Sequence, residues 1–209
     1  MVEEKRGKFI VLEGIDGCGK SSQLLNIAQY IINKSKYNHV LVTREPYKIR
    51  EIRGILRQDS NAYSQAKKLA ELFVQDRKEH VQEIILPALN KSVDVISDRY
   101  KYSTIVYQSV QGIPIEELIE MHKNMPVPDL IFIFDAPVEI AEKRMSKDNR
   151  QEHKFEANKE FQEKLRQRYL EMSKIFPEEK IVIIDSTKTI EEIGKEIIKI
   201  LDENFEQDL

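Results

Sequence analysis

Short apolar runs alternate along the chain with longer segments that have the period of a helix. Five runs are rich in Val, Ile and Leu and have the length of strands: Lys8–Glu13, His39–Thr43, Val93–Asp98, Leu130–Asp135 and Lys180–Asp185. Most of them are apolar enough to be buried on both faces, which is typical of parallel strands covered by helices. The alternation predicts an α/β fold with three layers, in which helices cover both faces of a five-stranded parallel sheet.

Two of the intervening segments carry apolar residues at helical spacing. The first follows the first strand, and the second lies near the end of the chain behind a capping box formed by Thr189 and Glu192. We interpret both stripes as parts of the core: Leu24, Ile27, Ala28 and Ile31 in the first, and Ile190, Ile193, Ile197, Ile200 and Leu201 in the second.

Length and composition indicate one soluble domain. The 209 residues contain no Gly-, Pro- or Ser-rich linker, so we expect a single domain over 1–209. Hydrophobic residues make up 41% and charged residues 33%, and the apolar runs are too short to cross a bilayer. The charged N-terminal segment does not resemble a secretory signal, which leads us to expect a cytoplasmic protein without membrane partners.

Charge and metal-binding residue types narrow the class of ligand. A net charge of −3 argues against a nucleic-acid binder, because such proteins normally carry a basic field. A single cysteine excludes an internal disulfide, and the four histidines show no metal-ligand spacing. Small anionic ligands remain compatible with this composition.

A glycine-rich segment follows the first predicted strand directly and matches the phosphate-binding loop pattern. Its residues are Gly14, Ile15, Asp16, Gly17, Cys18, Gly19, Lys20 and Ser21, with Ser22 next. The glycines let backbone N–H groups turn toward phosphate oxygens, the lysine reaches the outer phosphates, and the first serine can ligate Mg²⁺. The strand before the loop and the helical spacing after it favour this interpretation over a simple turn. The pattern predicts binding of a nucleoside triphosphate with Mg²⁺.

The thiol within this loop allows two interpretations. A cysteine near a helix N-terminus can have a lowered pKa and react with oxidants, whereas Cys18 can also be a small residue tolerated at a variable position.

Charged residues end two more predicted strands. Asp98 and Arg99 follow an apolar run, where a carboxylate can hold Mg²⁺ and a guanidinium can clamp a phosphate. The alternative is a surface salt bridge between these two neighbours. Arg44 and Glu45 precede Pro46 at the end of another strand, and both can line the same cleft.

Two predicted helices carry candidate base-binding groups. In the helix predicted over Ser64–Pro87, Phe73 and Arg77 are four residues apart, which places an aromatic ring beside a guanidinium. Taken alone, the segment favours interpreting Phe73 as a core residue and Arg77 as a solvated charge. After Arg99, hydroxyl and amide groups share two adjacent helix edges: Ser103 with Tyr107, and Thr104 with Gln108.

Together these motifs closely resemble the thymidylate kinases, and among them most of all the archaeal branch. The similarity covers nearly the whole chain, and its landmarks appear in order: Glu13–Gln23, Thr43–Pro46, Leu72–Arg77, Asp98–Tyr100, Ser103-Thr104 and Tyr107-Gln108. The resemblance implies the P-loop NTPase fold and transfer of the γ-phosphoryl group of ATP to dTMP, giving dTDP and ADP, with Mg²⁺. It also implies a homodimer.

The resemblance assigns roles to the candidate residues. It implies that Phe73 stacks on thymine, that Arg77 and Gln108 bind the base edge with Thr104 nearby, and that Tyr107 packs against the deoxyribose. Asp16 is expected to hold the 3′-hydroxyl, and Arg44 and Arg99 the acceptor phosphate, in a site completed by Glu45 and Ser103. On the donor side, Arg144 is expected to stack on adenine next to the backbone of residues 186–189. Lys20 and Arg99 are the expected catalytic cations, and Ser21 and Asp98 the Mg²⁺ ligands.

The chain departs from the family pattern at two places. Tyr47-Lys48-Ile49 stands where many bacterial members have two glycines, and Gly17 stands where the eukaryotic branch has an arginine. A cation for the transferring phosphoryl group is therefore expected from a small charged lid at about 146–158, with Arg150 as the first candidate and Lys154 as the second.

Alternative functions remain at this point. A regulatory GTPase is disfavoured because the chain lacks an Asn-Lys-x-Asp motif. A deoxynucleoside kinase or another monophosphate kinase shares the loop and differs in its acceptor contacts. A nucleotide-dependent binding protein is the non-enzymatic alternative.

Overall fold

The five predicted strands form one parallel sheet. The computed structural model describes residues 6–59, 61–147 and 158–205. The strands are β1 (Phe9–Glu13), β2 (Val40–Arg44), β3 (Asp94–Asp98), β4 (Leu130–Asp135) and β5 (Ile181–Asp185), in the order β2-β3-β1-β4-β5. Each lies within one residue of its predicted bounds, which confirms the α/β fold class.

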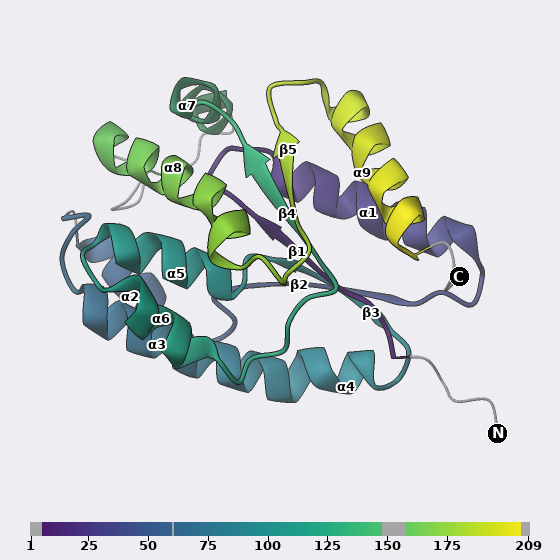
Figure 1. Ribbon diagram of the computed structural model, residues 1–209, viewed down its shortest axis with the longest axis horizontal. Helices are drawn as coiled ribbons and strands as arrows, with labels where there is room; N and C mark the ends of the chain where they lie inside the picture. Colours follow the sequence, from purple (N-terminus) through teal and green to yellow (C-terminus); the bar gives the residue numbers. More distant parts are fainter. Residues whose placement is uncertain (1–5, 60, 148–157, 206–209) are drawn as a thin grey trace.

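Helices cover both faces of this sheet. They are α1 (Lys20–Lys34), α2 (Arg50–Gln58), α3 (Ala66–His80), the π-helix η1 (Val81–Ile85), α4 (Leu86–Leu89), α5 (Lys101–Val110), α6 (Ile115–His122), α7 (Val138–Lys147), α8 (Lys159–Ile175) and α9 (Ile190–Phe205). Helices α1 and α9 pack together on one face, whereas α5, α8 and the path from α3 to α4 cover the other (Figure 1). The result is the predicted three-layer arrangement.

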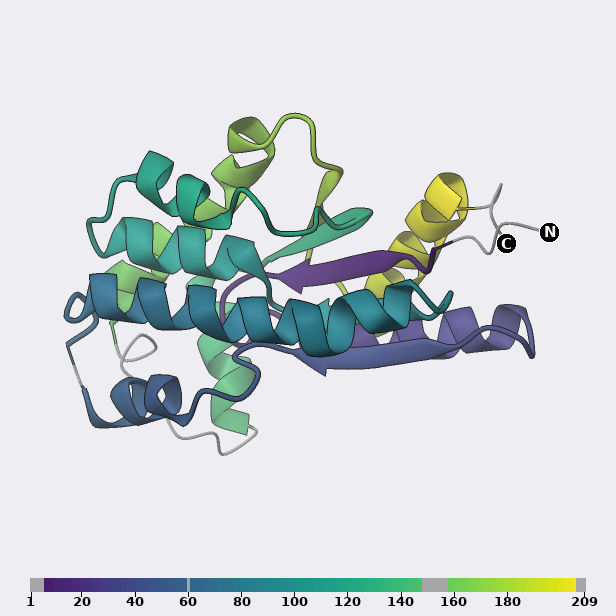
Figure 2. The same ribbon diagram turned by 90° about the horizontal axis from the view of Figure 1, so that it is seen from below.

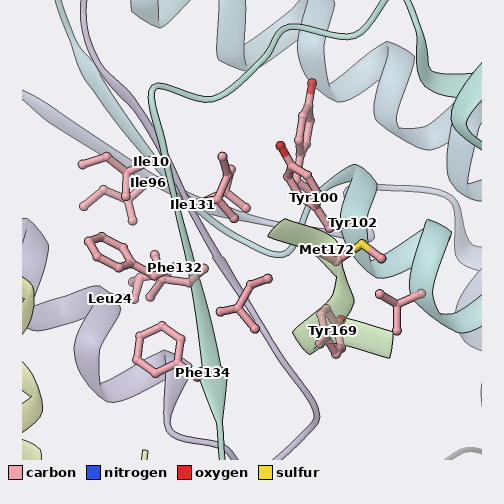
Figure 3. Packing of buried hydrophobic residues seen from close by; sticks show 14 of the residues in the cluster. Ile10, Leu24, Ile96, Tyr100, Tyr102, Ile131, Phe132, Phe134, Tyr169 and Met172 are labelled. Carbon is pink, nitrogen blue, oxygen red and sulfur yellow. The ribbon is translucent and has the colours of Figure 1, made fainter. Parts of the chain in front are cut away.

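Side chains of the central strands alternate between the two helical layers. Phe132 and Phe134 of β4 point toward Leu24 of α1, while Ile131 points toward Tyr102 and Met172 on the other side (Figure 3). All six are nearly or fully buried. The central strands β1, β3 and β4 therefore match the predicted burial on both faces.

The two outer strands are less buried than their sequences suggest. Val42 on β2 is 45% exposed and Ile183 on β5 is 41% exposed. Both strands lie at an edge of the sheet, where the helical layers do not cover both faces completely. The prediction that most of the five strands are buried on both faces is therefore confirmed by the three central strands, and the two edge strands are the exceptions.

The predicted helix over Ser64–Pro87 has different bounds and contains an irregular segment. It begins at Ala66, widens into the π-helix η1 and continues through Pro87 to Leu89, as one helical path in Figure 2. In the wider segment Leu86 N–H donates to the carbonyl of Val81, five residues earlier. Pro87 directly follows this wider segment as the second residue of α4, and the helical path continues past it to Leu89. The expectation that Pro87 ends the helix is wrong.

The apolar stripes of the terminal helices lie mostly in the core. The four predicted residues of α1 are buried, and so are Ile193, Ile197 and Leu201 of α9. Ile190 is 55% exposed, so the prediction that it belongs to the core is wrong. The capping box forms as expected, because Thr189 N–H donates to Glu192 Oε2 and Glu192 N–H donates to Thr189 Oγ1.

No helix within the described residues has both the length and the apolar character needed to cross a membrane.

Candidate active site

The ends of β1, β2 and β3 open into a cavity of 770 Å³. Parallel strands end at the same edge of a sheet, so residues from distant parts of the chain meet there. The cavity is lined by Asp16, Gly17, Gly19, Lys20, Ser21, Ser22, Gln23, Arg44, Asp98, Arg144, Lys188, Ile190 and Ile193. Its volume suits a nucleotide-sized ligand, and four basic side chains face two acidic ones in its lining.

At two positions of the phosphate loop, a residue other than glycine would clash with the neighbouring backbone. Gly14 and Gly17 have φ of 137° and 78°. A Cβ on Gly14 would lie 2.7 Å from the carbonyl oxygen of Phe134, and one on Gly17 would lie 2.4 Å from that of Ala141. The second contact gives a physical reason why this backbone has no place for an arginine at position 17.

Lys20 is held at the mouth of the loop. Its Nζ donates to the carbonyl oxygens of Gly14 and Ile15 at 3.0 and 2.8 Å, and the residue is 6% exposed. No side chain caps the start of α1, and its first turn has no acidic residue. The positive helix end and the ammonium group are therefore both directed at the loop, an arrangement that favours bound phosphate.

Cys18 is completely buried. Burial raises the pKa of its thiol, although the nearby Lys20 acts in the opposite direction. The interpretation of Cys18 as a reactive thiolate is therefore wrong. Its backbone carbonyl instead receives a bond of 3.5 Å from Arg144 Nη1.

Arg144 bridges the phosphate loop and the loop after β5. Its Nη2 donates to the carbonyl oxygen of Ser186 at 2.9 Å. Lys188 and the exposed Ile190 line the same cavity, so a guanidinium plane, an ammonium group and an apolar side chain are grouped at one end. This composition is suited to a heteroaromatic base.

Asp98 and Arg44 lie beside the phosphate loop. Oδ1 of Asp98 is buried and has no hydrogen-bond partner among the described residues. Ser21 lines the same cavity. Arg44 lines this cavity rather than the adjacent one that receives the other predicted acceptor residues.

Arg99 is fixed from several sides in a strained backbone conformation, with φ of 72°. Its Nη2 contacts Asp16 Oδ1 at 2.7 Å, and its Nη1 donates to Ser103 Oγ at 2.9 Å and to Tyr169 OH at 3.1 Å. Arg99 therefore forms its ion pair with Asp16 of the phosphate loop. The alternative interpretation, a salt bridge between Asp98 and Arg99, is wrong.

A buried carboxylate without a predicted role, Glu13, supports this arrangement. It is fully buried and accepts hydrogen bonds from the backbone N–H of Tyr100 and Ser103, from Ser103 Oγ and from Tyr169 OH. Burial raises its pKa, against the opposing effect of Arg99. The available signal was a charged residue at the end of an otherwise apolar strand, directly before the phosphate loop.

A second cavity adjoins the first at Asp16. Its lining contains every predicted acceptor residue except Arg44, together with two residues that were not predicted, Pro46 and Leu56. The lining residues are Asp16, Glu45, Pro46, Leu56, Phe73, Arg77, Arg99, Ser103, Thr104, Tyr107 and Gln108.

Arg77 lines this second cavity. It is 1% exposed, and its Nε donates to Glu45 Oε2 at 2.7 Å. Its Nη2 donates to the carbonyl oxygen of Tyr100 and to Thr104 Oγ1, and its Nη1 lies 2.6 Å from Nε2 of His122. The interpretation of Arg77 as a solvated charge is therefore wrong.

His122 on α6 accepts from Arg77 and was not predicted. Burial, and then the charge of Arg77, lower the pKa of this histidine to about 3, so the ring is neutral. Nδ1 lies 2.6 Å from the carbonyl oxygen of Leu118, which can only accept, so the proton sits on Nδ1. Nε2 is left as an acceptor for the guanidinium.

Aromatic rings form the walls of the second cavity. Phe73 is partly buried and packs against the core as well as lining the cavity, so it is not solely a core residue. Tyr107 is 7% exposed, and its ring centroid lies 6.5 Å from those of Phe161 and Tyr169. The guanidinium carbon of Arg99 lies 5.4 Å from the same centroid.

The predicted lid cations, Arg150 and Lys154, lie outside the described residues, as does most of the predicted lid at 146–158.

Comparison with known proteins agrees with this geometry. The family model described as "Thymidylate kinase" matches residues 12–197. A probable thymidylate kinase from Pyrococcus horikoshii is 38% identical, over 94% of this chain and 96% of that protein. Thymidylate kinases from Fervidobacterium nodosum and Mycoplasma capricolum subsp. capricolum are 36% and 38% identical, over 92% and 95% of this chain and 97% and 96% of the relatives.

Proposed function

This chain belongs to the thymidylate kinase family, and from that premise we propose that it transfers the γ-phosphoryl group of ATP to dTMP, giving dTDP and ADP. The observation that carries the proposal is the pair of cavities that meet at Asp16. One is built on a phosphate loop, and the other joins an aromatic wall to buried polar groups. A donor and an acceptor nucleotide can therefore lie with their phosphates at the shared boundary.

ATP is proposed to occupy the larger cavity. The backbone of residues 14–19, Lys20 and the first turn of α1, with Ser21 and Ser22, bind its phosphates. Arg144 stacks on adenine, opposite the chain after β5. Arg144 is already held by backbone carbonyls on both sides, which reduces the side-chain freedom it loses on binding.

Mg²⁺ is proposed to be held by Ser21 and Asp98. The fit rests on the partnerless buried Oδ1 of Asp98, because a buried carboxylate oxygen without a donor suits a hard cation. When bound, Mg²⁺ neutralises phosphate charge and orients the outer phosphates.

Asp98→Asn should raise the Mg²⁺ concentration needed for half-maximal activity by about 10-fold or more. The amide lacks the charge that the cation needs but has nearly the same shape, so the thermal unfolding midpoint should change little. Titration of activity with Mg²⁺ checks this. Asp185→Asn, at the end of β5 and outside the cavity lining, is the matched control; equal Mg²⁺ requirements in the two variants would contradict the assignment.

dTMP is proposed to occupy the second cavity. Phe73 stacks on thymine, Arg77 and Gln108 bind its edge near Thr104, and Tyr107 packs against C2′ of the deoxyribose, where a ribose hydroxyl would be buried without a partner. Glu45 and Ser103 support this site, the first by pairing with Arg77 and the second by bonding to Arg99.

The phosphates are proposed to be aligned by charge at the boundary of the two cavities. Asp16 holds the 3′-hydroxyl, Arg44 and Arg99 grip the acceptor phosphate, and Lys20 neutralises charge on the donor. Arg44 lies on the donor side of this boundary, which places it between the two ligands. Positioning and charge neutralisation supply most of the rate enhancement in phosphoryl transfer.

The proposal has further parts that rest on the sequence and on the family resemblance. They are a single domain over 1–209, a charged lid at about 146–158 that supplies Arg150 or Lys154 to the transferring phosphoryl group, and a cytoplasmic homodimer.

ADP production from ATP and Mg²⁺ tests the function, with dTMP, dUMP, UMP, dCMP, dGMP, AMP and thymidine offered separately. Turnover with dTMP well above every other acceptor is expected. Turnover only with thymidine would favour a deoxynucleoside kinase, and preference for another monophosphate would overturn the base assignments. No turnover with any acceptor would favour a binding protein.

Phe73→Ala should raise the KM for dTMP by about 10- to 100-fold while leaving the KM for ATP within twofold, because stacking on an aromatic ring typically contributes ~1–3 kcal/mol per base. Steady-state kinetics with each substrate varied in turn checks this. Tyr37→Ala, which truncates a ring that is 75% exposed, is the control. Equal losses for both substrates would point to a purely structural role.

A further inference from the structure

We propose that Gln111, which lies outside the cavity lining, fixes the direction of the Gln108 side-chain amide and so makes the acceptor cavity selective for 4-oxo over 4-amino pyrimidines. The inference deepens the proposed function and rests on it. Gln111 is a positioning residue, because it acts on the base through Gln108.

The direction of the Gln111 amide is set by the backbone of a neighbouring segment. Gln111 lies at the C-terminal end of α5, with its Nε2 2.6 Å from the carbonyl oxygen of Ala62 and 3.1 Å from that of Ser64. Carbonyl oxygens accept and never donate. The nitrogen end of this amide must therefore face the two carbonyls, and the oxygen end must face away from them.

The same rule then sets the direction of Gln108. Oε1 of Gln111 lies 3.0 Å from the amide nitrogen of Gln108. Since Oε1 is also only an acceptor, Gln108 must turn its NH₂ group toward Gln111. The NH₂ and oxygen ends of a side-chain amide have nearly the same shape, so shape alone does not set its direction. Here the two backbone carbonyls set the direction of both amides.

With its NH₂ group turned toward Gln111, Gln108 has its side-chain oxygen left as a hydrogen-bond acceptor. Gln108 is fully buried and lines the second cavity, and its Oε1 has no hydrogen-bond partner among the described residues. A buried acceptor without a donor is costly, so it favours a ligand that brings an N–H group. The geometry points to a base edge that donates at this position.

Pyrimidine bases differ at that edge. Thymine and uracil carry an N–H at N3 between two carbonyl oxygens, whereas cytosine has a bare acceptor at N3 beside its 4-amino group. The oxygen of Gln108 is complementary to the first pattern and places two acceptors together in the second. Arg77, which has only donors, is complementary to the 4-oxo group and opposes the 4-amino group.

Two substitutions at Gln111 test the relay. Gln111→Met removes both amide ends and frees Gln108 to turn, so the ratio of kcat/KM for dTMP to that for dCMP should fall by about 10-fold or more. Gln111→Lys still offers donors to the two carbonyls but also presents a donor to Gln108. It should turn the Gln108 oxygen away from the cavity, raise kcat/KM for dCMP and lower it for dTMP.

The change should appear mainly in KM for the acceptor, with kcat for dTMP and KM for ATP within about twofold of the wild type. Gln167→Lys, on the exposed surface of α8, is the control and should leave the ratio unchanged. In a double-mutant cycle, Gln111→Met should lower the ratio no further once Gln108→Met is present, because the relay acts only through Gln108.

The lysine variant keeps the test decisive if the methionine variant fails to fold, since a purely structural role predicts lost stability without a change of preferred base. A dTMP to dCMP ratio within twofold of the wild type in folded Gln111→Lys overturns the inference. So does an equal further loss in the Gln108→Met background. Wild-type protein that does not phosphorylate dTMP would overturn the proposed function instead.

Discussion

Arg99→Ala is expected to lower kcat by about 10²- to 10³-fold, the range observed when one preorganised charge-stabilising donor is removed from an active site. The guanidinium lies where the two cavities meet and is held by Asp16, Ser103 and Tyr169, so it needs little reorganisation to receive a phosphate. The loss should fall on kcat more than on KM for ATP, because the proposed clamp acts on the acceptor phosphate during transfer.

Initial rates with saturating ATP and dTMP, measured beside thermal unfolding, check this prediction. Arg168→Ala removes an arginine of α8 that pairs with Glu171 and lines neither of the two cavities, so it is the matched control. Arg99→Lys should recover only part of the activity, because an ammonium group lacks the planar fork. Normal turnover in a destabilised Arg99→Ala protein would reduce this residue to a structural role.

The neighbours of Arg99 supply the hydrogen bonds that hold its backbone and its guanidinium in place. A non-glycine residue with φ of 72° is strained, and the conformation persists only where surrounding contacts favour it. Arg99 N–H donates to the carbonyl of Leu12, and Ser97 Oγ donates to the carbonyl of Arg99. Glu13 holds the side chain of Arg99 in place indirectly, because it accepts hydrogen bonds from the hydroxyls of Ser103 and Tyr169, which in turn accept from the guanidinium. The strained backbone of Arg99 thus occurs where its guanidinium is already oriented.

The sheet and the phosphate loop were predictable because their signals are local. β-branched runs mark each strand to within a residue, and the glycines at 14 and 17 stand where the backbone needs positive φ. The burial of β2 and β5 was not predictable from their own residues, because it depends on which strands lie at the edges of the sheet.

Contacts between distant parts of the chain could not be predicted from the sequence either. Glu13 meets Tyr169 across 156 positions, and Arg77 meets His122 across 45. The sequence shows an isolated acid and a histidine on an amphipathic helix, and neither pattern specifies a partner. The π-helix before Pro87 is a similar case, since the ordinary rule for proline predicts an end to the helix. Residue types were therefore informative about the site, whereas their supporting contacts required the fold.

Arg77→Met is expected to destabilise the protein by about 3–5 kcal/mol, the range found when one partner of a buried ion pair is removed. The side chains of Arg77 and Glu45 are 1% and 3% exposed, so the carboxylate would stay buried without its main partner. The acceptors of Thr104, Tyr100 and His122 would lose their donor as well. Urea unfolding followed by circular dichroism measures the change, and Lys78→Met on the exposed side of α3 is the control.

The double variant Glu45→Gln with Arg77→Met separates stability from recognition. Removing the carboxylate charge abolishes the cost of an uncompensated buried ion, so the double variant should regain part of the lost free energy of unfolding. Arg77→Met is also expected to raise the KM for dTMP, because it removes the donor proposed for the 4-oxo group, and the double variant should not lower that KM again. If stability and the KM for dTMP recovered together, the raised KM of Arg77→Met would reflect a disordered pocket, and Arg77 would have no direct contact with the base.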